Sequence, residues 1–572
     1  MAILQPLIDL AAICFEKGIR HVVISPGSRS AALTLAFVRH GGFRIHTCMD
    51  ERPAGFIGMG IAQQTGVPVV LVCTSGSAAY NFAPAVSEAF FQQIPLIVLT
   101  ADRPKEWQHQ YDGQTIYQSE IYGKHVKRSF EISPDYAHSD VQWAINRITN
   151  EAVNVAGTAP LGPVHINVPI REPFYPKESD ELLRSDSIRI IQRQRSEAGL
   201  STETWHELLD EWDDSSRILI AGGQQRSSEE LNQVLARITE EWDIPVVGDC
   251  ITNLGANDQF VRHHDLFLGG ENSAELRPDL LVTFGLSFIS KELKQFLRRN
   301  PPLRHWHISE DIFLADPTQS MTRQIPVSAT YFFKNLYEKI DYQLFTQNSE
   351  PENDSSYLTI WRQKEVLSRN LKRNYLQNLT SLNDLTSIDV FFKVLNAQIQ
   401  LHIANSMSIR YVNVLGADIG NAKIFSNRGT SGIDGCVSTA IGAAMVNDQP
   451  TFLIVGDVAF LYDRNGLLIK ELPQNLKIIV INNSGGNIFR MIDGPTGLSE
   501  LENYFETRHS FTAKRTCEDS GIQYFSVNEF EALEKVVAEF TRSQGLGLLE
   551  VFTDPYENER VWKELKRLGR ES

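Results

Sequence analysis

Short, continuous runs of β-branched and other apolar residues alternate with helical stretches along the whole chain. Runs that are apolar at nearly every position, rather than at every second one, are typical of strands buried on both faces of a parallel sheet. In the first third of the chain, the predicted strands are residues 21–25, 44–48, 69–74, 96–100 and 164–168. This part is therefore predicted to be an α/β unit.

The same alternation resumes twice, each time after a polar stretch. Residues 173–186 contain prolines and residues 347–356 are acidic and rich in Ser and Asn, so both are interpreted as linkers. The strands predicted after them are 218–221, 245–248, 280–284 and 306–308, and then 411–415, 452–455, 477–481 and 548–552. The sequence thus predicts an α/β fold with three doubly wound parallel-sheet domains, residues 1–180, 188–345 and 358–572.

The charge and the cysteines narrow the function classes. The 572 residues carry a formal net charge of −16 at pH 7, which argues against nucleic acid or an anionic membrane as the main partner. Anionic small substrates stay possible if their site carries local positive charge. No stretch of about 18 apolar residues is present, so no membrane span is expected. Six cysteines without CxxC spacing indicate reduced thiols and a cytoplasmic location.

The clearest chemical motif lies in the third part of the chain, where two predicted strands each end in a polar turn. Strand 452–455 leads into Gly456-Asp457, and strand 477–481 leads into Asn482-Asn483-Ser484-Gly485-Gly486. Asn483 follows Asp457 by 26 positions, enough for a crossover between neighbouring parallel strands. An Asp carboxylate and an Asn amide oxygen are hard ligands that suit Mg²⁺, and glycines let the backbone approach a diphosphate. Each turn alone is ordinary turn chemistry; the pair at this spacing favours a metal–diphosphate site.

Glu51 is a candidate for proton transfer. It follows the strand 44–48 and begins an apolar helical stretch, 54–62. From the residues alone, the favoured interpretation is an acid in the first helical turn that complements the helix dipole.

Several segments, spread over nearly the whole chain, resemble the MenD family of SEPHCHC synthases, which are thiamin-diphosphate (ThDP) enzymes. The matching segments are 25–30 (SPGSRS), Asp50-Glu51-Arg52, 74–78 (TSGSA), 100–104 (TADRP), Asn405-Ser406 with Arg410, 426–435 (SNRGTSGIDG), and the two turns at Asp457 and Asn483. The first and the 426–435 segments are specific, the TSG loop alone is weak, and the middle domain matches least. Val458 departs from the Gly-Asp-Gly of many ThDP enzymes, at a position that supplies no side-chain ligand.

The resemblance implies a reaction. A ThDP ylid attacks the keto carbon of 2-oxoglutarate, CO₂ leaves, and the resulting carbanion adds to isochorismate. The product is SEPHCHC (2-succinyl-5-enolpyruvyl-6-hydroxy-3-cyclohexene-1-carboxylate), an intermediate of menaquinone biosynthesis. The cofactors implied are ThDP and Mg²⁺ or Mn²⁺, and the chain would be a transferase.

The resemblance also assigns roles to residues. Glu51 would face the pyrimidine N1′ and Gln114 would lie near the reacting centre. Substrate carboxylates would be bound by Ser28, Arg29, Arg103, Lys291, Ser406, Arg410 and Arg428, since guanidinium forks suit carboxylates. The cofactor would contact Glu51, Ser431, Gly432, Ile433, Asp457, Val458, Asn483, Gly486, Asn487 and Ile488. The metal ligands would be Asp457, Asn483 and Gly485.

Several alternatives stay open. Arg103 could instead hold the turn around Asp102, and the alignment at Lys291 is ambiguous. His263-His264-Asp265 is interpreted as a solvated loop rather than a metal site, and Gly222-Gly223 as a turn too incomplete for nucleotide binding. The chain could be another ThDP carboligase or decarboxylase, such as an acetohydroxyacid synthase relative, or a non-catalytic ThDP-binding subunit. A homodimer or dimer of dimers with active sites shared between chains is also implied, without nucleic-acid partners.

Overall fold

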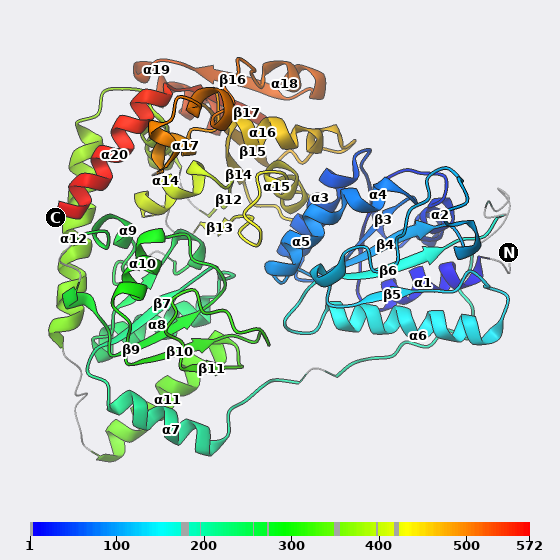
Figure 1. Cartoon of the computed structure of the whole chain (residues 1–572), viewed down its shortest axis with the longest axis horizontal. Coiled ribbons are helices and arrows are strands. Elements are labelled where there is room, and N and C mark those ends of the chain that lie inside the picture. The colour runs from blue at the N-terminus through cyan, green and yellow to red at the C-terminus, as the bar shows by residue number, and fades with distance from the viewer. Residues whose placement is uncertain are drawn as a thin grey trace.

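The computed structural model describes residues 4–172, 175, 182–194, 196–255, 257–270, 274–347, 355–395, 398–416, 422–492 and 494–571. These residues form three parallel sheets flanked by helices (Figure 1). The predicted class of three α/β domains is confirmed. Both predicted linkers, 173–186 and 347–356, lie largely outside the described residues, and the predicted domain boundaries stay predictions. Within the described part, no helix is long and apolar enough to cross a membrane.

The first domain is a six-stranded parallel sheet in the order β2-β1-β3-β4-β6-β5. Its strands are β1 (His21–Ile24), β2 (Arg44–Thr47), β3 (Val69–Cys73), β4 (Leu96–Asp102), β5 (Ser129–Glu131) and β6 (Val164–Pro169). One face packs against α1 (Gln5–Glu16), α2 (Ala31–His40) and α6 (Ser139–Ala156), and the other against α3 (Glu51–Thr65), α4 (Ser77–Asn81) and α5 (Ala83–Phe91). Successive strand residues alternate between these cores, with Val22 in the first and Val23 in the second. Burial on both faces explains the continuous apolar runs.

The central domain has five parallel strands in the order β11-β10-β9-β7-β8. The strands are β7 (Ile218–Gly222), β8 (Val246–Gly248), β9 (Leu280–Phe284), β10 (Arg304–Ile308) and β11 (Arg323–Ile325). The helices are α7 (Thr202–Asp213), α8 (Glu229–Trp242), α9 (His264–Phe267), α10 (Lys291–Arg299) and α11 (Ala329–Gln347). The strand order reverses between β7 and β9, which opens a crevice at the carboxyl ends of these strands.

The third domain has six parallel strands in the order β13-β12-β14-β15-β17-β16, the same relative order as the first domain. The strands are β12 (Gln400–Ile403), β13 (Lys423–Phe425), β14 (Thr451–Gly456), β15 (Leu476–Asn482), β16 (Gln523–Val527) and β17 (Gly547–Phe552). The helices, including α12, which leads into this domain, are α12 (Ser355–Gln377), α13 (Asp384–Val394), α14 (Met407–Leu415), α15 (Cys436–Ala444), α16 (Asp457–Asp463), α17 (Ile488–Met491), α18 (Lys514–Ser520), α19 (Phe530–Arg542) and α20 (Pro555–Glu571).

The strand predicted at 411–415 is wrong, because these residues end helix α14. Residues 411–415 are buried at every position, so their apolar pattern lacks the periodicity that distinguishes a helix from a buried strand. The strand that begins this domain is β12, which precedes α14 along the chain.

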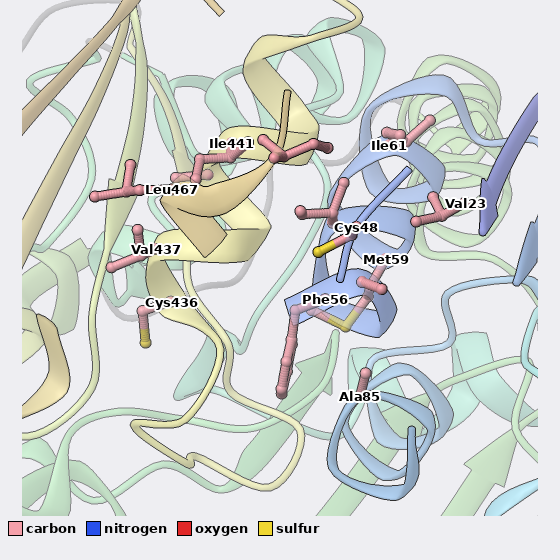
Figure 2. Close-up of a cluster of buried hydrophobic side chains, with 14 of the residues drawn as sticks. Val23, Cys48, Phe56, Met59, Ile61, Ala85, Cys436, Val437, Ile441 and Leu467 are labelled. Carbon is pink, nitrogen blue, oxygen red and sulfur yellow. The ribbon is translucent and has the colours of Figure 1, made fainter. Parts of the chain in front are cut away.

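Helices α3 and α15 join the first and third domains through an unusually close contact. A Cβ at Gly60 would lie 2.1 Å from the carbonyl oxygen of Thr439, and one at Gly442 would lie 2.0 Å from that of Ile57. Glycine is required at both positions because the two helix backbones approach each other. Figure 2 shows the apolar side chains of α3 (blue) and α15 (yellow) in one cluster, which continues into both sheets.

Candidate active site

The predicted metal ligands lie at two neighbouring strand ends of the third sheet. β14 and β15 are parallel, with Gly456 opposite Ile481, so the residues that follow them are brought together. A cavity of about 250 Å³ opens at this edge. Of the residues predicted to hold cofactor or metal, those lining it are Ile433, Asp457, Val458, Asn483, Gly485, Gly486, Asn487 and Ile488. Ser431 and Gly432 precede Ile433 and are not among its lining residues.

The orientation of Asn483 leaves its amide oxygen free for a ligand. Asn483 Nδ2 donates to Asp384 Oδ2 at 3.0 Å, and the buried Oδ1 has no hydrogen-bond partner among the described residues. The carboxylate of Asp457 is fixed by backbone N–H groups, 2.9 Å from Gly485 and 2.7 Å from Val458. A free amide oxygen beside a fixed carboxylate fits a hard cation such as Mg²⁺ or Mn²⁺.

Asp384, which sequence reasoning did not single out, sets that orientation. It is buried and also accepts hydrogen bonds from Thr553 Oγ1 at 2.6 Å and Asn558 Nδ2 at 2.8 Å. Burial raises the pKa of Asp384 to about 6, and the charge of Asp457 adds to the rise. No local motif marks this residue, because it lies 99 positions before Asn483 and meets it only through the fold.

Backbone conformations that residues other than glycine rarely adopt gather at this edge. Ser406, Ser431 and Ser484 have φ values of 71°, 61° and 66°. A Cβ at Gly485, whose φ is 158°, would lie 2.8 Å from the carbonyl oxygen of Glu506. Such strain persists where surrounding structure fixes it, commonly at functional sites.

Two half-buried arginines lie beside this cavity. Arg428 Nη1 donates to Asn405 Oδ1 at 3.0 Å, and Arg410 donates to the carbonyl oxygen of Ser406; Asn405 and Ser406 both line the cavity. Burial lowers the pKa of Arg410, and the charge of Arg428 lowers it further. Neither arginine forms an ion pair with a described residue, so this pocket of positive charge suits an anion.

The central domain adds a lysine to the arginine pair. Lys294, on α10, donates from Nζ to the carbonyl oxygen of Phe288 at 3.3 Å, and the adjacent Ser287 donates to the carbonyl oxygen of Arg428 at 3.1 Å. Burial lowers the pKa of Lys294, and the charge of Arg428 contributes. The predicted Lys291 is exposed at the first position of α10, so Lys294 is the lysine placed near the arginines.

The carboxyl edge of the first sheet carries a second group of predicted residues. Ser28 is exposed after β1, and Arg29 is buried, donating to the carbonyl oxygen of Ile170 and to Glu172, both at 3.0 Å. Behind this edge, the buried hydroxyl of Thr74 has no partner among the described residues.

The side chain of Arg103 contacts the loop that contains Asp112 and Gly113. Its Nη1 lies 2.8 Å from Asp112 Oδ2, and its Nε donates to the carbonyl oxygen of Gly113 at 3.2 Å. The loop presents Gln114, which is exposed with a φ of 57°. The structure therefore gives Arg103 a positioning contact, and its binding role stays a prediction.

Within one chain, Glu51 and the predicted metal ligands lie at opposite ends of α16. The residues flanking Glu51 contact the carboxyl end of that helix and the turn after it: Arg52 donates to the carbonyl oxygen of Tyr462 at 2.6 Å, and Asn465 Nδ2 donates to Asp50 Oδ2 at 2.9 Å. Asp457 begins the helix, which at seven residues is about 10 Å long. The lining residues of the metal cavity all come from the third domain.

The prediction that His263-His264-Asp265 is a solvated loop is wrong. All three residues are buried, and His263 Nδ1 lies 2.6 Å from Glu365 Oε1 while its Nε2 lies 2.9 Å from Lys372 Nζ. The local polar composition indicated a surface loop. The partners that allow burial are supplied by α12, about a hundred positions away in sequence, so the local sequence does not reveal them.

Comparison with known proteins agrees with this geometry. Three family descriptions match in succession: the N-terminal TPP binding domain of thiamine pyrophosphate enzymes at residues 9–122, their middle domain at 188–354, and their C-terminal TPP binding domain at 419–551. The chain therefore belongs to the thiamine-diphosphate enzymes.

Full-length relatives define the family within that class. Proteins named 2-succinyl-5-enolpyruvyl-6-hydroxy-3-cyclohexene-1-carboxylate synthase are 40% identical in Cytophaga hutchinsonii, over 100% of both chains, and 35% identical in Flavobacterium johnsoniae, over 99% of this chain and 98% of the relative. A protein of the same name in Porphyromonas gingivalis is 35% identical over 96% of this chain and 94% of its own. The chain belongs to this synthase family.

We predict that Asp384→Asn weakens metal binding. The new Nδ2 would face the Nδ2 of Asn483, two donors in contact, and would favour turning the amide nitrogen of Asn483 toward the metal. Loss of such a supporting contact typically costs about 10–100-fold in metal affinity. Titration of Mn²⁺ in the presence of ThDP, followed by electron paramagnetic resonance, measures this directly.

The matched control is Asp389→Asn on the same helix, because Asp389 pairs only with Lys393 among the described residues. Its Mn²⁺ affinity should equal that of the unaltered protein. Equal affinity in Asp384→Asn would show that Asp384 does not orient Asn483.

Proposed function

We propose that the protein is a SEPHCHC synthase: it decarboxylates 2-oxoglutarate and adds the remaining four-carbon unit to isochorismate, releasing CO₂. The observation that carries this proposal is the half-buried pair Arg410 and Arg428 beside the predicted metal–diphosphate cavity, in a chain that matches these synthases over its full length. Both substrates are dianions, and the net charge of the protein is −16, so the site needs its own concentrated positive charge.

The third domain would hold the diphosphate and its metal. Asp457 and the free oxygen of Asn483 would be ligands, with the carbonyl of Gly485 as a third, and the glycine turn would bring N–H groups to the phosphates. Thiamine diphosphate, when bound, supplies the electron sink for decarboxylation. Ile433, which lines the same cavity, would support the bend between the two cofactor rings.

Glu51 would hold and return a proton at the pyrimidine N1′. It is half-buried within the single chain, at the carboxyl edge of the first sheet. Exclusion of water by a neighbouring surface would strengthen its hydrogen bond to the ring. Arg29, Ser406, Arg410 and Arg428 would orient the substrate carboxylates, with Gln114 near the reacting carbon.

Each site would be built from two chains of a homodimer, alone or within a dimer of dimers. This is supported by the separation of Glu51 from Asp457 along α16 and by a cofactor cavity lined from the third domain alone. A two-fold partner would bring its first-sheet edge to this cavity, giving two equivalent sites.

The reaction is tested by incubating the protein with ThDP, Mg²⁺, 2-oxoglutarate and isochorismate and detecting SEPHCHC by mass spectrometry. Glu51→Gln should lower kcat by about 10²–10⁴-fold, because the amide cannot exchange a proton. Calorimetry should still detect ThDP binding. The control Glu151→Gln alters a half-buried acid of α6 that is paired with Arg128 and Arg147, and it should keep full activity. Absence of product from the unaltered protein would refute the proposed reaction.

Which lysine of α10 binds the substrate, Lys294 or Lys291, is tested by comparing one variant of each. We expect Lys294→Met to raise KM by about tenfold or more, in line with the 1.5–3 kcal/mol of a charged hydrogen bond. Lys291→Met should leave KM unchanged because Lys291 is exposed. The opposite pattern would assign the role to Lys291.

Shared sites are tested by mixing two inactive variants, Glu51→Gln and Asp457→Ala, under conditions that allow subunit exchange. Each mixed dimer would have one site with both defects and one intact site. With half of the dimers mixed, about a quarter of the original activity should return. If exchange is demonstrated by mass spectrometry and no activity returns, each site lies within one chain.

A further inference from the structure

A buried carboxylate of the central domain lies between helix α10 of its own domain and helix α14 of the third domain. Asp249 follows β8 directly and is 3% exposed. Its Oδ2 accepts the backbone N–H of Ile289 at 2.5 Å and that of Ser290 at 3.3 Å. Its Oδ1 accepts a hydrogen bond from Asn413 Nδ2 at 3.0 Å. One side chain therefore contacts both the loop that precedes α10 and the side of α14.

The end of α10 that Asp249 holds is the end that carries Lys294. Ser290 is the N-cap of this helix, and its Oγ accepts the N–H of Leu293 at 3.0 Å. Lys294 lies in the first turn after Ser290, and its Nζ donates to the carbonyl oxygen of Phe288, in the same loop, at 3.3 Å. A shift of the loop would therefore move the amine of Lys294.

The contact with α14 lies one turn beyond Arg410. Asn413 follows Arg410 by three positions, so the two side chains are neighbours on the helix surface. Asn413 Oδ1 accepts the N–H of Cys250 at 2.9 Å, which fixes the amide with its Nδ2 toward Asp249. The rotation of α14 about its own axis, and with it the point from which Arg410 extends, is thereby tied to the central domain.

A carboxylate at this position satisfies all of its neighbours, which an amide cannot do. The N–H groups of Ile289 and Ser290 can only donate, and Asn413 presents its amide nitrogen. His264 Nε2 also lies 3.3 Å from Oδ1. An ionised carboxylate has about four acceptor positions on two oxygens. An amide would place its nitrogen against one set of donors, and leaving buried donors unsatisfied costs free energy.

The occupied carboxylate leaves the neighbouring cations available. Burial lowers the pKa values of Arg428 and Lys294, and the charge of Asp249 partly offsets this lowering in both. Neither cation forms an ion pair with Asp249 in the part of the chain that the structure describes. Glu88, the other acid near Arg428, accepts the N–H groups of the two residues that follow Arg428. Both acids thus hold the backbone without neutralising the cations.

We propose that Asp249 is a positioning residue for substrate binding: it fixes Lys294 relative to Arg410, so that cations of two domains act on one anion. The charges of Lys294 and Arg410 are near enough to interact. Asp249 itself is not among the lining residues of the predicted cofactor cavity, so it would act through the two helices. This positioning role rests on the proposed function, because it takes the bound anion to be a substrate dicarboxylate.

Asp249→Asn separates positioning from simple electrostatics, because the two effects have opposite signs. Loss of a negative charge beside Arg428 and Lys294 would by itself tighten the binding of an anion. Loss of the correct position should weaken it, and we expect this effect to prevail, with KM for 2-oxoglutarate raised about tenfold. The value of kcat should change much less than KM, and the Kd of ThDP should be unchanged.

Calorimetry with glutarate makes the same comparison without turnover. Glutarate has the two carboxylates of 2-oxoglutarate but no keto group, so it can bind the protein loaded with ThDP and Mg²⁺ without reacting. Asp249→Asn should raise its Kd about tenfold as well. If the unaltered protein binds glutarate but forms no SEPHCHC, the proposed reaction fails, and the glutarate measurements still decide the role of Asp249.

The double variant Asp249→Asn with Asn413→Asp exchanges donor and acceptor. The amide at position 249 would donate to the carboxylate at position 413, which could still accept the N–H of Cys250. The oxygen of that amide would accept the N–H groups of Ile289 and Ser290. Because residues in contact couple non-additively, the double variant should bind glutarate within about threefold of the unaltered protein.

A milder variant keeps the test decisive if Asp249→Asn does not fold. Asn413→Ala removes only the contact with α14 and should raise the Kd of glutarate about threefold or more. The control Glu292→Gln, on α10, alters a contact 3.2 Å from Arg570 of α20 at the same domain boundary and should leave that Kd unchanged.

Four results would overturn the positioning role of Asp249. They are an unchanged or lowered Kd and KM in Asp249→Asn, an unchanged Kd in Asn413→Ala, no recovery of affinity in the double variant, and no binding of glutarate by the unaltered protein.

Discussion

The backbone contact between α3 and α15 fixes the arrangement on which the candidate site depends. Gly60 on one helix and Gly442 on the other each meet a carbonyl oxygen of the opposite helix, so the contact is reciprocal and admits no side chain at either position. Around it, a single apolar core runs from the first sheet to the third, with α3 and α15 between them. Because protein cores are close-packed, the carboxyl edges of the two sheets are held at a fixed position relative to each other within the chain.

The relative position of the two sheets separates the two groups of candidate residues within one chain. The two sheets share one strand order, and both present candidate functional groups at their carboxyl edges: Glu51 on the first, Asp457 and Asn483 on the third. The packing of α3 places Asp50 and Arg52, the neighbours of Glu51, against the carboxyl end of α16, whereas the predicted metal ligand Asp457 begins that helix. In the proposed two-fold assembly, each of the two edges would meet its counterpart on the partner.

Much of the fold could be predicted from the sequence because parallel strands buried on both faces leave continuous apolar runs, as β3 and β15 do. The same property caused the error at 411–415, since a fully buried helix leaves a similar run. At the site, the turns at Asp457 and Asn483 could be found because each follows its strand directly. Asp384, Lys294 and Glu88 could not, because their roles depend on contacts across the fold. The buried His263 was mistaken for a loop residue for the same reason.

The distribution of charge would let an acidic protein bind the dianions of the proposed reaction. Arg410 and Arg428 are half-buried and form no ion pair with a described residue, an arrangement that costs free energy and that an anionic ligand would relieve. Glu88 lies close enough to affect the pKa of Arg428, yet its oxygens are occupied by the N–H groups of Gly429 and Thr430. The carboxylate therefore shapes the loop without neutralising the guanidinium. The neutral amides of Gln92 and Gln224 extend these hydrogen bonds to the central domain, so the loop is held from three domains while its positive charge would stay available to the proposed substrate.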